Sequence, residues 1–313
     1  MTSIFENTHS KVTVHILHDD TLTDDNRRKF LRTAEKYSQG IEFHDVTEYR
    51  DRVDQDIQDL YMSGFTVGTL YKLAIHELLP LDKVIYLDGD IIVNLDIRDL
   101  WEIDTGDNCL AGAVDEVVVK EGRYPLSFWG ILCRLNGYRS YSYINGGVLV
   151  MNLCEMRRQG CSFHNALERL KEYLPTFVCG DQDVFNSLFL GNIKLIDQRF
   201  NRQLWNADDN LSGSIIHTNH RKSWNVYPEM PADRLYWKMY LHSAWGDDVT
   251  PSEFVDVIAD ISKPKLLHNS PRQCLMRLLR TIWLRVSLFY VRRIVSLVVR
   301  SIYHRMKYRL TRS

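Results

Sequence analysis

The first third of the chain alternates between short apolar runs and longer stretches of mixed polarity. Between Lys11 and Leu17 the apolar residues occupy every second position, which predicts a strand with one buried face. Thr23 then stands where a helix N-cap would, and two aspartates follow it. The other elements expected in this region are a strand at 41–46, a helix at 66–79 and a strand at 84–87. This order predicts an α/β sheet.

The same rhythm continues to residue 217. The further strands that we expect lie at 109–114, 147–151, 193–196 and 214–217. Helical patterns separate them at 162–173 and 182–190. In open α/β sheets, ligands bind outside the carboxyl ends of the strands. The polar residues that end the apolar runs are therefore the first candidates for a functional site.

Charge divides the chain into two parts. At 313 residues and 45% apolar composition, the chain can bury a sizeable core. Its net charge of -1 hides an asymmetry, because all 40 acidic residues lie at or before Asp260. Residues 1–260 carry about -14 and residues 261–313 about +13. We expect a folded domain over 1–260 and a basic amphipathic helical tail over 261–313.

The tail between Gln273 and Leu310 mixes aliphatic and aromatic residues with arginine, which suits an anionic membrane surface. The alternative is a helix packed on the domain. The acidic body argues against nucleic acid as a partner. No stretch approaches the ~18 uncharged apolar residues of a spanning helix. The six cysteines form no CxxC pair and follow no secretory signal. We expect a cytoplasmic protein, peripheral on the inner face of the cytoplasmic membrane.

Two aspartates follow the apolar run at 84–87. Asp88 and Asp90 at positions i and i+2 of an extended backbone would point to the same side and share one cation, and Gly89 leaves room for a ligand. Mg²⁺ and Mn²⁺ prefer carboxylate and phosphate oxygens, so the pair suits a metal-bound diphosphate. The alternative is a turn in which the aspartates cap backbone amides.

A histidine ends the run at 214–217. His217 can supply a neutral nitrogen ligand, and Lys222 can neutralise phosphate as a point charge. A histidine at a strand end is more often a structural residue, so this pattern alone is weak.

Two further polar motifs precede regular elements. Asp181 and Gln182 open the helix at 182–190, where an aspartate serves either as an N-cap or as a hydrogen-bond partner of sugar hydroxyls. Asn145 precedes two glycines and the strand at 147–151, and paired glycines can simply serve a turn.

Taken in order, these motifs resemble glycosyltransferase family 8, the retaining enzymes that include bacterial lipopolysaccharide galactosyl- and glucosyltransferases and glycogenin. The resemblance runs from about Ser3 to about Trp245. Its landmarks, in chain order, are Ser3–Asn7, Val14–Leu17, Tyr86–Asp90, Tyr143–Leu149, Asp181–Asp183, Ile216–His217 with Lys222 and Trp224, and Leu235–Lys238. The family implies a GT-A fold, a mixed nucleotide-sugar-binding sheet flanked by helices with the acceptor site beside it.

The resemblance also implies roles for single residues. The expected metal ligands are Asp88, Asp90 and His217, which would hold Mn²⁺ or Mg²⁺. The expected contacts to the UDP-sugar donor are Lys222 at the diphosphate and Asp115, Asn145, Asp181 and Gln182 around the sugar. Lys72 falls where the family usually has an arginine, so it keeps the charge but loses the bidentate fork.

The mechanism follows from these parts. The metal and Lys222 would stabilise negative charge on the leaving UDP while the anomeric carbon gains oxocarbenium character. Retention requires either a protein nucleophile or attack of the acceptor hydroxyl on the face that the diphosphate leaves. The two candidate nucleophiles are Asp181 and Gln182. An amide is a poor nucleophile, so we favour same-face attack.

The chain departs from the family pattern in two places. The family opens with a strand, about twenty residues upstream of Ser3–Asn7, that contacts uracil and ribose, and we expect that strand to be absent here. The segment from His217 to Trp224 is also one residue shorter than usual, with Ser223 in place of proline. His220 is therefore a competing third ligand.

These observations predict a metal-dependent retaining transferase that moves a hexose from UDP-glucose or UDP-galactose to a cell-surface glycan acceptor such as lipopolysaccharide. Two alternatives remain open at this point. One is a catalytically inactive glycan-binding protein that has lost its donor site. The other is a metal-dependent phosphohydrolase built on Asp88 and Asp90.

Overall fold

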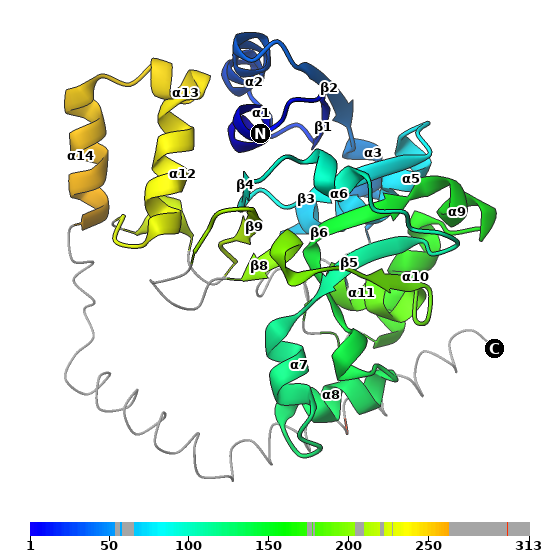
Figure 1. Cartoon of the computed structure of the whole chain (residues 1–313). Helices are drawn as coiled ribbons and strands as arrows, with labels where there is room; N and C mark the ends of the chain where they lie inside the picture. Colours follow the sequence, from blue (N-terminus) through cyan, green and yellow to red (C-terminus); the bar gives the residue numbers. More distant parts are fainter. Residues whose placement is uncertain are drawn as a thin grey trace.

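The computed structural model describes residues 1–53, 57, 66–173, 177, 179–203, 210–219, 222–226, 228–262 and 299. Nine strands lie in these residues: β1 (Thr13–His18), β2 (Gly40–Asp45), β3 (Lys83–Leu87), β4 (Ile91–Asn94), β5 (Leu110–Val114), β6 (Ile144–Asn152), β7 (Ile193–Leu195), β8 (Arg202–Gln203) and β9 (Ser214–His217). Each strand that the sequence pattern predicts is present within a few residues of its expected bounds. Figure 1 shows helices on several sides of these strands.

The helices of the first half of the described chain are α1 (Thr2–Asn7), α2 (Asp24–Lys36), α3 (Thr47–Asp51), η1 (Val67–Ala74), α5 (Ile75–Leu78), α6 (Arg98–Trp101), α7 (Glu116–Gly122), α8 (Phe128–Asn136) and η2 (Ser140–Ser142). Those of the second half are α9 (Leu153–Arg158), α10 (Phe163–Tyr173), α11 (Asp181–Leu188), η3 (Gln198–Asn201), η4 (Ser223–Asn225), α12 (Pro231–Leu241), α13 (Ala244–Asp247) and α14 (Pro251–Ser262). The label η marks 3₁₀ helices.

The strands form three sheets. The largest has the order β3-β6-β5-β7 and is mixed, because β6 runs antiparallel to β3 and β5 whereas β7 runs parallel to β5. The second has the order β4-β9-β8, and the third is the parallel pair β1-β2. The chain passes directly from β3 in the first sheet to β4 in the second, so residues 88–90 join two sheets.

Strand β6 lies at the centre of the core. Leu149 and Met151 face one apolar cluster, which includes side chains of α9, α10 and α11. The alternating residues Val148 and Val150 face a second cluster, which includes side chains of α1 and α2. Because successive side chains of a strand point to opposite faces, β6 is buried on both sides. Figure 1 shows these two groups of helices on different sides of the strands.

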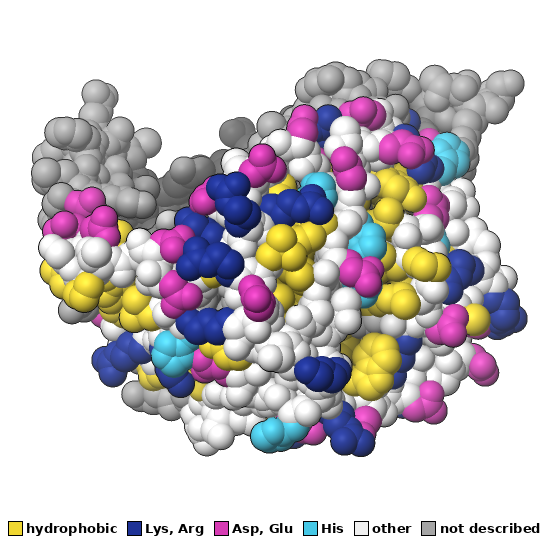
Figure 2. Space-filling view, turned by 90° about the horizontal axis from the view of Figure 1, so that it is seen from above, with side chains coloured by type: hydrophobic (Ala, Val, Ile, Leu, Met, Phe, Trp, Pro, Cys, Tyr) yellow, Lys and Arg dark blue, Asp and Glu magenta, His cyan; other side chains and the backbone are white. Residues whose placement is uncertain are grey.

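Helix α2 begins as the sequence predicts and connects distant parts of the chain. The Thr23 hydroxyl accepts a hydrogen bond from the Asn26 backbone amide, which confirms the expected N-cap. Its basic side chains pair with acidic residues at the end of α13 and just after it, Lys36 with Asp247 and Arg32 with Asp248. Figure 2, a view from above, shows acidic and basic side chains intermingled on this face. These exposed pairs add little stability individually.

Three local predictions need correction. The stretch expected as one helix at 66–79 divides into the 3₁₀ helix η1 and the short α5, because an apolar pattern alone does not separate a period of 3.0 from one of 3.6. Residues 88–90 form a turn rather than extended backbone, because β3 and β4 pair with different strands. Gly146 and Gly147 lie inside β6, so the turn alternative for these glycines is wrong.

The basic tail over 261–313 lies outside the described residues, apart from the end of α14 and residue 299. None of the helices in the described ranges is long and apolar enough to cross a membrane.

Candidate functional site

The turn between β3 and β4 carries Asp88 and Asp90. The backbone amide of Asp88 donates to the carbonyl of Gly147 at 2.8 Å, which fastens the turn to the central strand β6. The Asp90 side chain is almost buried, with 9% of its surface exposed, and that of Asp88 is 29% exposed. An added Cβ at Gly89 would meet no atom within 4 Å. The turn therefore presents two carboxylates beside open space.

His217 brings a nitrogen to the same point from β9. In the sheet its backbone lies opposite Ile91, the residue after the turn. Its Nε2 lies 3.4 Å from Asp90 Oδ1 and 4.0 Å from Asp88 Oδ2. The ring packs over Gly147, where an added Cβ would lie 2.3 Å from the ring carbon Cε1. Only glycine at this position of β6 leaves room for the imidazole.

Asn201 orients the imidazole of His217. The Oδ1 of Asn201 lies 3.0 Å from the His217 Nδ1, and because a carboxamide oxygen can only accept, Nδ1 carries the proton. The lone pair of a neutral His217 is then on Nε2, which faces the two aspartates. The Nδ2 of Asn201 donates to Asn145 Oδ1 at 2.9 Å. A single amide thus connects His217 to the residues of β6.

Lys72, from the 3₁₀ helix η1, lies between two carboxylates. Its Nζ is 2.8 Å from Asp181 Oδ2 and 3.0 Å from Asp88 Oδ1, and it donates to the Gly146 carbonyl at 3.2 Å. Burial opposes its charge, but Asp181, Tyr86 and Asp88 hold the pKa of Lys72 well above its ordinary value. Lys72 is therefore a permanent cation that fixes Asp88 and Asp181 relative to each other.

Tyr86 completes the surroundings of Asp88. Its hydroxyl donates to Asp88 Oδ1 at 2.6 Å, and the ammonium of Lys72 lies 4.5 Å from the centre of its ring. Burial raises the pKa of the Tyr86 hydroxyl, so the group remains a hydrogen-bond donor. The sequence offers a signal for this role, because Tyr86 and Asp88 are two positions apart at the end of one strand.

A second group of polar side chains joins β5, β6 and α11. Asp115 caps α7, accepting from the backbone amides of its first turn through Oδ1. Its Oδ2 accepts from Asn145 Nδ2 at 3.0 Å and from Gln182 Nε2 at 3.2 Å. Gln182 Oε1 in turn accepts from the Gly146 backbone amide at 2.9 Å. All three side chains are buried, so their orientations are well determined by these bonds.

Lys222 approaches Asp90 from the open side. Its ammonium pairs with Asp90 Oδ2, and its side chain is 39% exposed. Burial alone would raise the pKa of Asp90, but the hydrogen bond and charge of the protonated form of His217 and the ammonium of Lys222 outweigh it and hold that pKa below its usual range. Asp90 is therefore ionised at neutral pH, and Lys222 is its one flexible partner among the described contacts.

The donor set of this cluster fits a divalent cation. Asp88, Asp90 and His217 offer one ligand atom each, and these atoms lie within 4.8 Å of one another. Four carboxylates belong to the connected network, from Asp88, Asp90, Asp115 and Asp181, against the two ammonium groups of Lys72 and Lys222. The network is thus acidic when His217 is neutral, and it favours binding of a cation.

The structure brings all nine site residues of the sequence prediction into one connected network. They are Lys72, Asp88, Asp90, Asp115, Asn145, Asp181, Gln182, His217 and Lys222. The N-cap alternative for Asp181 does not hold, because Gly180 is the N-cap and the Asp181 carboxylate pairs with Lys72. His220, the competing third ligand, lies outside the described residues. Sequence reasoning missed Tyr86 and Asn201.

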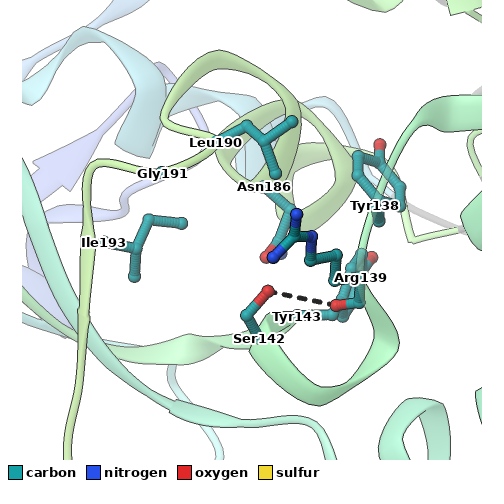
Figure 3. Close-up of a pocket in the computed structure, with 8 residues that line it drawn as sticks. All are labelled: Tyr138, Arg139, Ser142, Tyr143, Asn186, Leu190, Gly191 and Ile193. Atoms are coloured by element: carbon teal, nitrogen blue, oxygen red, sulfur yellow. Dashed lines mark hydrogen bonds between the residues drawn. The ribbon is translucent and has the colours of Figure 1, made fainter.

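A separate cavity of about 100 Å³ lies on the far end of α11, and Figure 3 shows the residues that line it. Asn186 uses its side chain there to bond both backbone groups of Ile144, at 2.8 and 2.9 Å. Tyr143 donates to Asp183 Oδ1 at 2.6 Å. None of the charged side chains of the network lines this cavity. Its residues anchor the start of β6, which carries Asn145, on α11.

Two curated relatives are similar to this chain in sequence over more than half of its length. GlyF, a glycosyltransferase of Streptococcus pneumoniae, is 26% identical over 208 residues, covering 62% of this chain and 47% of that protein. The lipopolysaccharide 1,3-galactosyltransferase of Salmonella typhimurium is 24% identical over 201 residues, covering 58% of this chain and 57% of that protein. The chain spans about half the length of these curated relatives.

A solved structure confirms the fold. The crystal structure of the galactosyltransferase LgtC in complex with donor and acceptor sugar analogs matches with a TM-score of 0.63 and 23% identity, covering 82% of this chain and 92% of LgtC. This likeness confirms the expected GT-A fold, a mixed sheet flanked by helices. The family model described as glycosyl transferase family 8 matches residues 1–229. The chain therefore belongs to glycosyltransferase family 8.

Proposed function

We propose that this chain is a retaining glycosyltransferase that moves a hexose from UDP-glucose or UDP-galactose to a cell-surface glycan such as lipopolysaccharide. The observation that carries the proposal is the convergence of Asp88, Asp90 and His217 beside the flexible Lys222. Family membership supports sugar transfer, and the acceptor is suggested by the name of the Salmonella relative. The same geometry would suit a nucleotide diphosphate bound through a cation.

Asp88, Asp90 and His217 would hold Mn²⁺ or Mg²⁺, two carboxylate oxygens and one imidazole nitrogen being an acceptable set for both ions. When bound, the ion would act as a Lewis acid that neutralises charge on the diphosphate. Lys72 and Tyr86 hold the Asp88 carboxylate, and Asn201 holds the ring of His217. The protein thereby fixes its ligands before the donor arrives, which reduces the reorganisation needed during reaction.

Lys222 is the residue that can follow the leaving group. It is exposed on a long side chain, and its contact with Asp90 is the single ion pair found for it in the described part of the chain. With a cation bound at Asp90, Lys222 would be free to pair with a phosphate oxygen of the donor. Charge that develops on the departing UDP would then meet a second positive group.

The buried amides and carboxylates of the network would orient the sugar. Asp115, Asn145 and Gln182 fix one another, and Asp181 is fixed by Lys72. Both polar atoms of the Gln182 side chain are already engaged, so it serves better to position the donor than to attack it. The Asp181 carboxylate is held against an ammonium, which lowers its nucleophilicity. We therefore favour attack by the acceptor hydroxyl on the face that the diphosphate leaves.

We also propose that the enzyme works at the inner face of the cytoplasmic membrane. The support is compositional: residues 261–313 carry about +13, and anionic lipid attracts basic segments. The tail would then bring the catalytic domain over 1–260 to a lipid-linked acceptor.

The direct test measures UDP release by the purified chain. With Mn²⁺ and UDP-glucose or UDP-galactose we expect slow donor hydrolysis, accelerated by a lipopolysaccharide core acceptor and abolished by EDTA. GDP-mannose serves as the control donor. Binding of UDP is measured in parallel by calorimetry. Glycan binding without UDP binding would favour the inactive alternative, and cleavage of p-nitrophenyl phosphate without transfer would favour the phosphohydrolase.

A further inference from the structure

A second group of potential metal ligands lies on the parallel pair β1-β2, away from the network described above. His15 of β1 lies opposite Glu42 of β2, and His44 is two positions further along β2. Because side chains alternate between the faces of a strand, all three share one face of this sheet. They are the only other group of this kind among the described residues, and no residue is common to both groups.

The three ligand atoms lie at separations that suit a small tetrahedral ion. His15 Nδ1 is 2.9 Å from His44 Nε2 and 3.4 Å from Glu42 Oε2. His44 Nε2 and Glu42 Oε2 are 3.8 Å apart. Zinc bonds of about 2.0–2.1 Å at tetrahedral angles place ligand atoms roughly 3.3–3.4 Å apart. The observed separations bracket that value, so an ion would need only small movements of three side chains.

Hydrogen bonding leaves this group incompletely satisfied. The two ring nitrogens at 2.9 Å can share one proton, so at least one of them offers a lone pair. The Glu42 oxygen is farther from both rings than an ordinary hydrogen bond.

We propose that His15, Glu42 and His44 form a zinc site that clips β1 to β2. Two imidazoles and one carboxylate suit zinc better than magnesium, which prefers an all-oxygen shell. The Glu42 side chain is 59% exposed, so water can enter as the fourth ligand. The histidine side chains are about 20% exposed, so the ion has access from solvent.

The site would stabilise a sheet that has only two strands within the described residues. Within the described residues, β1 and β2 pair only with each other, and a sheet of two strands is marginal without further partners. The strands are separated by the thirteen-residue helix α2. An ion held by both strands binds the folded state alone and therefore raises its stability. This inference does not depend on the proposed sugar transfer.

The test must separate this site from the cluster of Asp88, Asp90 and His217, which also binds metals in our proposal. We would use the chain carrying Asp90→Asn as background and add His44→Gln or His15→Gln to it. His164→Gln, on the exposed face of α10, is the matched control. The probes are Zn²⁺, counted after equilibrium dialysis, and Co²⁺, whose visible absorption is much stronger in four-coordinate than in six-coordinate sites.

The background protein should bind one Zn²⁺, show the four-coordinate Co²⁺ spectrum and melt several degrees higher with zinc than without it. His44→Gln and His15→Gln should each lower zinc affinity by at least about 100-fold. This loss is larger than the one expected when only a hydrogen-bond partner of a metal ligand is removed. His164→Gln should change nothing. Circular dichroism verifies that each variant is folded. Equal zinc binding in the background protein and in its His44→Gln derivative would overturn the proposal, as would a background protein that binds no zinc.

Discussion

The cluster of Asp88, Asp90 and His217 and the cluster on β1-β2 hold three donor atoms at similar separations, but their surroundings differ. His217 is 3% exposed and its outer nitrogen is bonded by Asn201, whereas His15 and His44 are partly exposed. In the described part of the chain, no side chain bonds the outer nitrogen of either of these two histidines. Lysines neutralise the first cluster, and none pairs with the second among the described contacts.

This difference separates a site built for chemistry from one suited to holding strands together. A catalytic site needs ligands that do not move when charge develops, which requires buried partners around them. An ion that joins two strands needs ligands from both of them, and these ligands do not have to resist charge that develops during a reaction. The first cluster also opens onto free space beside Gly89, as a substrate requires.

Loss of a ligand carboxylate should have the largest effect. Asp88→Asn or Asp90→Asn removes one charge from the cation site, and we expect Mn²⁺-dependent UDP release to fall at least about 10³-fold. The control is Asp82→Asn at the other end of β3, where the side chain is 91% exposed. The measurement is initial rate against Mn²⁺ concentration. Transfer by Asp88→Asn at the wild-type rate would show that the network is not the donor site.

Much of this cluster was predictable from the sequence, for a physical reason. Polar residues that end apolar runs mark the ends of strands, so Asp88 and His217 could each be chosen as candidates, and the resemblance to the family implied that they share one metal site. The sequence left a turn and an extended backbone at Gly89 as open alternatives, because the choice depends on β3 and β4 pairing with different partner strands. Asn201 could not be predicted, because it reaches His217 from a 3₁₀ helix with no periodic pattern to identify it.

Removal of the buried ammonium should lower stability. Lys72→Met leaves Asp88 and Asp181 facing each other without a cation, and we expect a loss of about 3 kcal/mol in the free energy of unfolding. Lys72→Arg keeps the charge and should retain most of the stability that Lys72→Met loses. Lys120→Met on the exposed side of α7 is the control, with a change within about 0.5 kcal/mol. Urea unfolding of the three variants provides the measurement.

The pH dependence of this effect follows from the raised pKa of Lys72. A group whose pKa is raised by folding contributes fully below its unfolded value, here 10.5, and loses its contribution as pH rises through the folded value. Wild type and Lys72→Met differ in their free energy of unfolding, and one part of that difference comes from the charge of Lys72. This part should therefore stay constant between pH 6 and pH 9 and decline only in strong alkali. A difference that disappears by about pH 8 would contradict the assignment.

Two glycines on either side of the cluster should respond differently to the same added methyl group. Gly147→Ala places a Cβ against the His217 ring, and we expect about 2 kcal/mol of destabilisation and weaker Mn²⁺ binding. Gly89→Ala meets no neighbour, so its stability without donor should match that of the wild type. Thermal unfolding and manganese titration compare the two variants. Equal destabilisation by both would mean that His217 does not lie where the structure has it.

The smallest effect is expected at Asn201. Its replacement tests whether the hydrogen bond to the outer nitrogen of His217 is what distinguishes the two clusters. Asn201→Ala removes the group that holds the proton of His217 on Nδ1, and we expect Mn²⁺ affinity to fall about tenfold with all three ligands still present. Asn201→Asp keeps an acceptor for Nδ1 and should recover most of that affinity, although it cannot donate to Asn145. The measurement is the Mn²⁺ concentration at half-maximal rate, together with the maximal rate. An unchanged manganese requirement in Asn201→Ala would show that burial alone, without the outer hydrogen bond, sets His217 apart from His15 and His44.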